Sequence, residues 1–207
     1  MILGNLNKAN LLVIIFLFFG SVSVGFTMIG ETHYAIMSII IGAIIHFFNG
    51  AYQYQEDLEE EELSFAIELD SLSKMVTYGL APSVLLVQIT NQSVVSVMVA
   101  AFYLLAVATR IAHYNRPLEL QGEVEESSVY GLPLVSIAMV LPLLSILTWI
   151  VPTTLVMYLW ILAFGLCLVG FILKIELPRI PANFIFAILA LGIFALGLLL
   201  IQGPIKF

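Results

Sequence analysis

The sequence predicts an all-α membrane protein, a polytopic transmembrane helical bundle of about seven spans. Of its 207 residues, 61% are hydrophobic and only 10% are charged, whereas soluble domains carry about 25% charged residues. The mean hydropathy is +1.10, and apolar runs reach about twenty residues, the length that crosses the hydrocarbon core of a bilayer. These observations exclude an ordinary soluble globular domain.

The first two predicted helices follow a short polar N-terminus. Residues 11–29 form an apolar run that is long for a signal peptide and lacks a small-x-small cleavage site, so we expect a retained helix. Residues 34–48 form a shorter second segment. The aromatic residues at its end suit the membrane–water interface; they are Phe47, Phe48, Tyr52 and Tyr54.

Five further helices complete the bundle. In chain order they cover residues 66–89, 93–112, 132–151, 153–173 and 182–201. A short polar turn separates the first two, Pro152 separates the next two, and the last is almost wholly apolar. Longer polar connections are expected at 49–65, 113–131 and 174–181, which places all three on one side of the membrane. We expect residues 1–207 to form a single transmembrane domain.

The basic residues predict the orientation, because Lys and Arg near the ends of spans are retained on the cytoplasmic side. Six of the seven fall on one predicted side: Lys8, Lys74, Arg110, Arg116, Lys174 and Arg179. Only Lys206 falls on the other. We therefore expect a multi-pass protein of the cell membrane with its N-terminus and long loops in the cytoplasm and its C-terminus outside.

The net charge of −7 is concentrated in one segment. Six of the 14 acidic residues lie within residues 56–62, in an acidic cytoplasmic loop expected over 55–64. An acidic balance of this kind argues against nucleic acid as a partner. The single cysteine, Cys167, excludes a disulfide framework and a cysteine-based zinc site within one chain.

Ionisable residues at membrane depth mark the candidate site, because charge is expensive to bury in lipid. His46 and Asn49 are three residues apart, and Asp70 and Lys74 are four apart, so each pair shares one helix face. In an antiparallel hairpin, all four side chains could meet at the cytoplasmic end. The alternative is that the first pair is interfacial and that Asp70 and Lys74 form a self-neutralising pair.

Three blocks of the sequence closely resemble the CDP-alcohol phosphatidyltransferases, especially their bacterial phosphatidylserine synthase branch. They are ELDSLSKMVTYGLAP at 68–82, RIAHYN at 110–115 and GLP at 131–133, where the family reads roughly LDSLSDxVSFGxAP, RLARFN and GLP. The resemblance covers residues 5–133. It implies a helical membrane enzyme, commonly a homodimer, that joins a CDP-activated lipid to a small alcohol such as serine and releases CMP. It also implies substrate contacts at Gly50, Ser71, Ser73, Arg110 and Asn115.

The sequence departs from the family pattern, DxxDGxxAR followed by GxxxDxxxD, at the positions that hold two divalent cations. His46 and Asn49 stand at the first two aspartate positions, and Asp70 keeps the third. Lys74 stands at the fourth, whose aspartate is the usual base for the attacking hydroxyl. Divalent cations prefer oxygen ligands, so we expect Mg²⁺ to bind poorly. Glutamates of the acidic loop, or Glu68, could replace the lost ligands. Alternatively, His46 with Asp70 could favour Mn²⁺ or Zn²⁺.

Three functions therefore stay open. The first is a catalytically degenerate phosphatidylserine-synthase-like protein of phospholipid metabolism. It would bind phospholipid or CDP-diacylglycerol through Lys74 and Arg110 as fixed cations, without a cofactor, and form a homodimer or associate with an active synthase. The second is an active phosphatidyltransferase with a rearranged metal site that holds Mg²⁺ or Mn²⁺ at Asp70. The third is a transporter or structural membrane protein whose polar residues only position helices.

Overall fold

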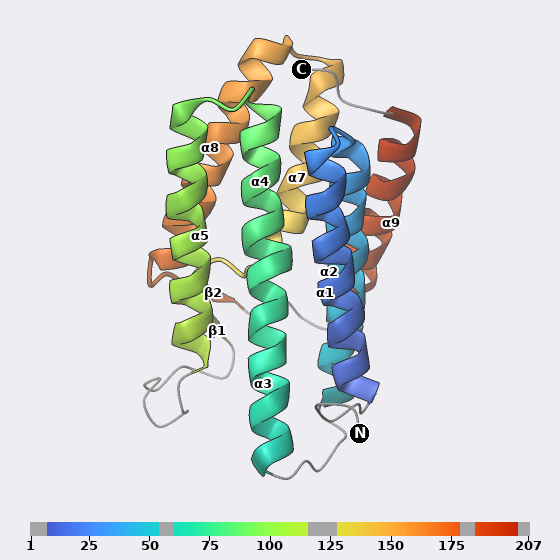
Figure 1. The fold of residues 1–207 in the computed structure, drawn as a ribbon, viewed down its shortest axis with the longest axis vertical. Coiled ribbons are helices and arrows are strands. Elements are labelled where there is room, and N and C mark those ends of the chain that lie inside the picture. Colours follow the sequence, from blue (N-terminus) through green and yellow to red (C-terminus); the bar gives the residue numbers. More distant parts are fainter. Residues whose placement is uncertain (1–7, 54–59, 116–127, 179–184, 203–207) are drawn as a thin grey trace.

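In the computed structural model the chain forms a bundle of helices that run up and down alongside one another (Figure 1). The structure describes residues 8–53, 60–115, 128–178 and 185–202. Four helices of these residues are long and apolar enough to cross a membrane: Asn10–Met28, Glu62–Ile89, Val94–Tyr114 and Thr153–Ile172. Three shorter apolar helices cover Thr32–Phe48, Ser136–Trp149 and Ala190–Gln202. The prediction of an all-α membrane bundle is confirmed.

The first two helices form a hairpin. Helix α1 (Lys8–Met28) turns at Gly30, which has a φ of 84°, into α2 (Thr32–Gln53). A left-handed backbone at this point favours glycine because it has no Cβ. Both helices lie close to the predicted segments, and α2 continues five residues beyond Phe48.

The third segment is one continuous helix with an irregular turn in its middle. It consists of α3 (Glu60–Lys74), the π-helical turn η1 (Met75–Leu80) and α4 (Ala81–Ile89). The prediction of a loop over 55–64 is therefore wrong for residues 60–64, which are helical. Residues 54–59 lie outside the described part of the structure.

The remaining helices are α5 (Val94–Tyr114), α7 (Ser136–Ile146) with the 3₁₀ turn η2 (Leu147–Trp149), α8 (Thr153–Ile172) and α9 (Ile185–Gln202). The fifth segment starts four residues later than predicted, because the Leu132 amide bonds to the Gly170 carbonyl instead of opening a helix. Two three-residue strands, β1 (Ser128–Tyr130) and β2 (Glu176–Pro178), pair antiparallel. Segments this short carry no periodic signal in the sequence.

The core lies between the helices, and the outward faces are apolar as well. The largest fully buried side chains are aromatic and include Trp160, Tyr78, Tyr103, Phe16 and Phe164. Large apolar side chains such as Phe18, Leu162 and Phe194 are more than half exposed, as expected where lipid is the solvent. We call the end of the bundle where α1 and α3 begin and where α2, α5 and α8 end the basal end (Figure 1).

Candidate functional site

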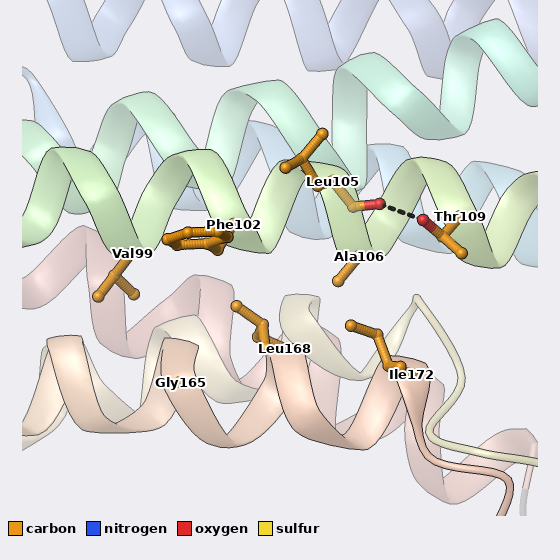
Figure 2. A pocket seen from close by; sticks show the side chains of 8 residues that line it. All are labelled: Val99, Phe102, Leu105, Ala106, Thr109, Gly165, Leu168 and Ile172. Carbon is orange, nitrogen blue, oxygen red and sulfur yellow. Dashed lines mark hydrogen bonds between the residues drawn. The ribbon is translucent and has the colours of Figure 1, made fainter.

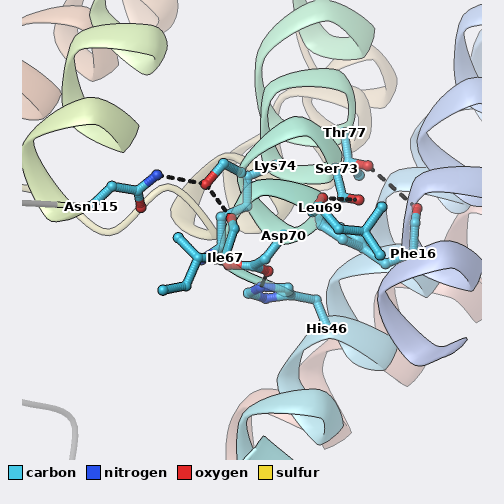
Figure 3. Close-up of polar contacts among 10 residues, drawn as sticks. Phe16, His46, Ile67, Leu69, Asp70, Ser73, Lys74, Thr77 and Asn115 are labelled. Atoms are coloured by element: carbon cyan, nitrogen blue, oxygen red, sulfur yellow. Dashed lines mark hydrogen bonds and ion pairs between the residues drawn. The ribbon is translucent and has the colours of Figure 1, made fainter. Parts of the chain in front are cut away.

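Three ionisable side chains meet near the basal end and form what we call the Asp70 cluster (Figure 3). Asp70 and Lys74 project from one face of α3, and the Lys74 ammonium forms an ion pair with Asp70 Oδ2. His46 comes from α2, and its Nε2 lies 3.2 Å from Asp70 Oδ1. The side chains of His46, Asp70 and Lys74 are 22%, 18% and 29% exposed. The cluster is thus half-buried rather than sealed in the core.

The contact with Asp70 fixes the chemistry of the His46 ring. An ionised carboxylate only accepts hydrogen bonds, so Nε2 carries a proton and donates it; when the ring is neutral, Nδ1 is then an acceptor. Two aromatic rings hold the imidazole in place. The Phe16 ring centroid is 4.7 Å away, and the Tyr78 ring stands perpendicular at 5.9 Å. His46 is therefore an oriented imidazole and not a freely rotating interfacial side chain.

The donors of this cluster do not fit a pair of divalent cations. Both oxygens of Asp70 are engaged, one by an imidazole N–H and the other by an ammonium group. A cation bound to Asp70 would have to displace Lys74 or approach it against charge repulsion. Within the described ranges, no three His, Cys, Asp or Glu side chains lie close enough together to hold a metal ion.

Asn49 and Gly50 follow His46 by about one turn of α2. Their side-chain positions lie outside the described part of the structure. The prediction that Asn49 joins the cluster therefore stays a prediction.

Ser71 and Asn115 connect two helices beside the cluster. The Asn115 side-chain amide donates to Ser71 Oγ at 2.7 Å, and Ser71 Oγ donates to the Ile67 carbonyl at 2.6 Å. Ser73, by contrast, is fully buried and donates to the Leu69 carbonyl within its own helix. Ser71 and Asn115 lie near enough to the surface to meet a ligand, whereas Ser73 faces the interior.

Arg110 is buried against backbone carbonyls and is 6% exposed. Its guanidinium donates to the Gly131 carbonyl at 3.1 Å and to the Phe171 carbonyl at 3.2 Å, and it lies over the Tyr114 ring. Gly131 has a φ of 67°, and a Cβ there would come 2.5 Å from Arg110 Nη1 and 2.9 Å from the Leu173 carbonyl oxygen. Two of the sequence blocks that carry the family resemblance therefore meet in space, and Arg110 joins α5 to α8.

Helices α1 and α2 pack closely against the η1 turn beside the Asp70 cluster. The Thr77 hydroxyl donates to the Phe16 carbonyl at 3.3 Å. A Cβ on Gly20 would overlap the Thr77 side chain, and one on Gly42 would come 3.2 Å from the Phe16 ring. Thr77 lies in the block at 68–82 that carries the family resemblance. The sequence did not single out Phe16 or Gly20, because small and apolar residues in an apolar run give no local signal of a site.

An apolar cavity of about 320 Å³ lies between α5 and α8 (Figure 2). Its lining residues are Val99, Phe102, Leu105, Ala106, Thr109, Gly165, Leu168 and Ile172. The hydroxyl in this lining, that of Thr109, donates to the Leu105 carbonyl of its own helix. The cavity therefore offers no group suited to a phosphate or to proton transfer, and the Asp70 cluster is the candidate site.

Comparison with known proteins agrees with the resemblance of the sequence blocks. No family model matches the chain. The chain is 31% identical over 93 residues to the CDP-diacylglycerol–serine O-phosphatidyltransferase of Saccharomyces cerevisiae, a match that covers 44% of this chain and 33% of the yeast protein. The chain thus spans about a third of the length of the relative that it matches. Together with the apolar helices, this similarity supports a membrane protein related to the phosphatidyltransferases.

Proposed function

We propose that this protein is a phosphatidylserine-synthase-like membrane protein that binds the headgroup of a phospholipid or of CDP-diacylglycerol at the Asp70 cluster, without metal-dependent phosphatidyl transfer. The observation that carries the proposal is the occupation of both Asp70 oxygens by side chains of the chain itself. A transferase of the related family needs several carboxylates to neutralise a pyrophosphate through bound cations. Here an ammonium stands where such a cation would bind.

Lys74 is the group best suited to an anionic ligand. Its side chain is 29% exposed, and an ammonium group makes strong charge-assisted hydrogen bonds to phosphate oxygens. A phosphate that approaches Lys74 competes with Asp70 for the ammonium, while the His46 N–H continues to neutralise part of the carboxylate charge. The cluster can thus exchange an internal ion pair for one with a ligand.

Arg110 has a different part in this proposal from the one predicted. Its two carbonyl contacts and its burial favour a structural role that keeps α8 against α5. We therefore assign the headgroup contact to Lys74, with Ser71 and Asn115 beside it. By the distribution of basic residues, the basal end faces the cytoplasm, and the bound lipid belongs to that leaflet. The protein would act as a homodimer or together with an active synthase.

The proposal is tested with purified protein in lipid nanodiscs, by measuring both binding of CDP-diacylglycerol and release of CMP in the presence of serine and Mg²⁺ or Mn²⁺. We expect saturable binding and no CMP release above that of empty discs. Lys74→Gln should weaken binding about fivefold to tenfold, the loss of one charge-assisted contact. The matched control is Lys174→Gln, which removes the same charge from an exposed site at the same end of the bundle.

Two results would count against this function. Metal-dependent release of CMP that is lost in Asp70→Ala would establish an active phosphatidyltransferase with a rearranged metal site. Equal binding by the wild type, Lys74→Gln and Lys174→Gln would show that the Asp70 cluster does not contact the headgroup. The polar residues would then only position helices.

A further inference from the structure

We propose that Tyr103 is a positioning residue for the Asp70 cluster: it holds a π-helical turn in the third segment, and this turn directs Asp70 and Lys74 toward α2. The inference deepens the proposed function and rests on it only in taking the cluster as the binding site. It depends on the backbone between residues 70 and 83 and on one hydroxyl of α5.

The turn η1 inserts one residue into an otherwise continuous helix. At its end the Ala81 amide donates to the Val76 carbonyl, five residues back, where an α-helix would use the carbonyl four residues back. One extra residue rotates the helix before the turn by about 100° relative to the helix after it. This turn therefore sets the direction in which the Asp70 and Lys74 side chains point relative to α4.

Because of Pro82, one backbone carbonyl of this turn needs a hydrogen-bond donor from another helix. Proline has no N–H, so the Tyr78 carbonyl, four residues earlier, cannot receive the α-helical hydrogen bond from residue 82. In the interior of a membrane protein, no bulk water replaces a missing donor. The Tyr103 hydroxyl supplies one, donating to the Tyr78 carbonyl at 2.7 Å from the neighbouring α5.

The contact is buried and closely packed. Tyr103 is fully buried. Gly79 lies against the same helix, where a Cβ would come 2.9 Å from Leu104 Cδ1 and 3.2 Å from Val107 Cγ1. The absence of a side chain at Gly79 lets the turn approach α5 closely enough for the hydroxyl to reach the carbonyl.

The two halves of the helix are held by separate side-chain contacts. The half after the turn is fixed by the Ser83 hydroxyl, which donates to the Ala100 carbonyl at 3.3 Å, and by buried Leu85 and Leu86. The half before the turn meets α2 through the Asp70–His46 contact. If the π turn closed to an α turn while α4 stayed in place, Asp70 would rotate by about 100° and lose His46.

The test compares Tyr103→Phe with Tyr158→Phe, which removes a hydroxyl from a tyrosine that is 66% exposed on α8. The readout is the ¹⁵N NMR spectrum of protein labelled at its three histidines, with His46→Gln used to identify the His46 signals. Asp70 keeps the proton on His46 Nε2, so the wild type should show two distinct ¹⁵N resonances for this ring. Tyr158→Phe should leave them unchanged.

In Tyr103→Phe we expect the His46 resonances to move together as the two tautomers exchange, while those of His33 and His113 stay in place. We also expect CDP-diacylglycerol affinity to fall about fivefold. Retention of the His46 pattern in folded Tyr103→Phe protein would overturn the proposal. Because the NMR readout needs no lipid ligand, it can fail or succeed independently of the headgroup-binding function.

A second variant covers the case in which Tyr103→Phe does not fold. Tyr103→Phe combined with Pro82→Ala gives the Tyr78 carbonyl an amide donor from residue 82, which restores an α-helical bond and removes the reason for the π turn. We expect this double variant to fold and to lack the wild-type His46 pattern. A folded double variant that keeps that pattern would refute the positioning role.

Discussion

At the scale of single residues, compensation of charge dominates the basal end. Asp70 is neutralised on one oxygen by an ammonium and on the other by an imidazole N–H. An unpaired carboxylate at this depth would be costly to desolvate, so each partner lowers the cost of the other two. The same arrangement reduces the ability of Asp70 to hold a metal ion.

Asp70→Asn should destabilise the protein by about 1–2 kcal/mol, because the ammonium and the imidazole lose their shared acceptor in a half-buried site. The measurement is thermal unfolding in detergent micelles. Glu68→Gln is the control, since it removes a carboxylate from an exposed position on the same helix. Equal effects of the two variants would contradict local compensation.

Gly131→Ala should cost at least about 2 kcal/mol, since it places a Cβ against a backbone carbonyl and the Arg110 guanidinium at a left-handed φ. Gly165→Ala, on the helix that Arg110 contacts, meets no atom within 4 Å and should be close to neutral. The comparison is again made by thermal unfolding. A neutral Gly131→Ala would refute the tight arrangement of Arg110 between α5 and α8.

At the scale of helices, close contacts between small residues decide how α1, α2 and the η1 turn pack. Lipid supplies no hydrophobic driving force between helices, so association depends on close packing and interhelical hydrogen bonds. Gly20 and Gly42 both face Thr77. This contact sets the distance between α1 and the segment that carries Asp70.

Gly20→Ala should therefore destabilise the bundle by about 1–3 kcal/mol, because its Cβ would overlap Thr77. Gly25→Ala on the same helix meets no atom within 4 Å and should be neutral, or stabilising by less than about 1 kcal/mol from its higher helix propensity. Thermal unfolding of the two single variants separates packing from propensity. Similar losses in both would show that α1 is not packed through Gly20.

At the scale of the whole molecule, the orientation of the bundle in the membrane decides which leaflet the Asp70 cluster contacts. In a Cys167→Ser background, which removes the single cysteine, Glu68→Cys places a thiol at the basal end and Val94→Cys places one at the opposite end. A membrane-impermeant maleimide should label intact cells only through Val94→Cys. Labelling of Glu68→Cys alone would reverse the orientation inferred from the basic residues.

Sequence periodicity and hydropathy predicted the helical class and the approximate position of each apolar segment. They did so because a backbone in lipid must satisfy its hydrogen bonds locally, so a run of about twenty apolar residues has one stable conformation. The helical spacing of Asp70 and Lys74 left an ion pair between them as one of two alternatives, and the ion pair is present. The start of α3 was misplaced, because a run of glutamates is compatible with both a solvated loop and a helix N-terminus.

The tertiary structure decided which of these residues meet and what they can do. His46 and Asp70 are in contact although they are 24 positions apart in the chain, and no local sequence pattern specifies this contact. It depends on the packing of Gly20 against Thr77 and on the Tyr103 hydroxyl that bonds to the Tyr78 carbonyl. The sequence by itself determined a membrane bundle of apolar helices and the spacing of its ionisable residues along them, because lipid acts on each segment separately. Only packing between helices, which acts on pairs of distant segments, brought His46 to Asp70 and formed the half-buried, charge-compensated cluster with Lys74.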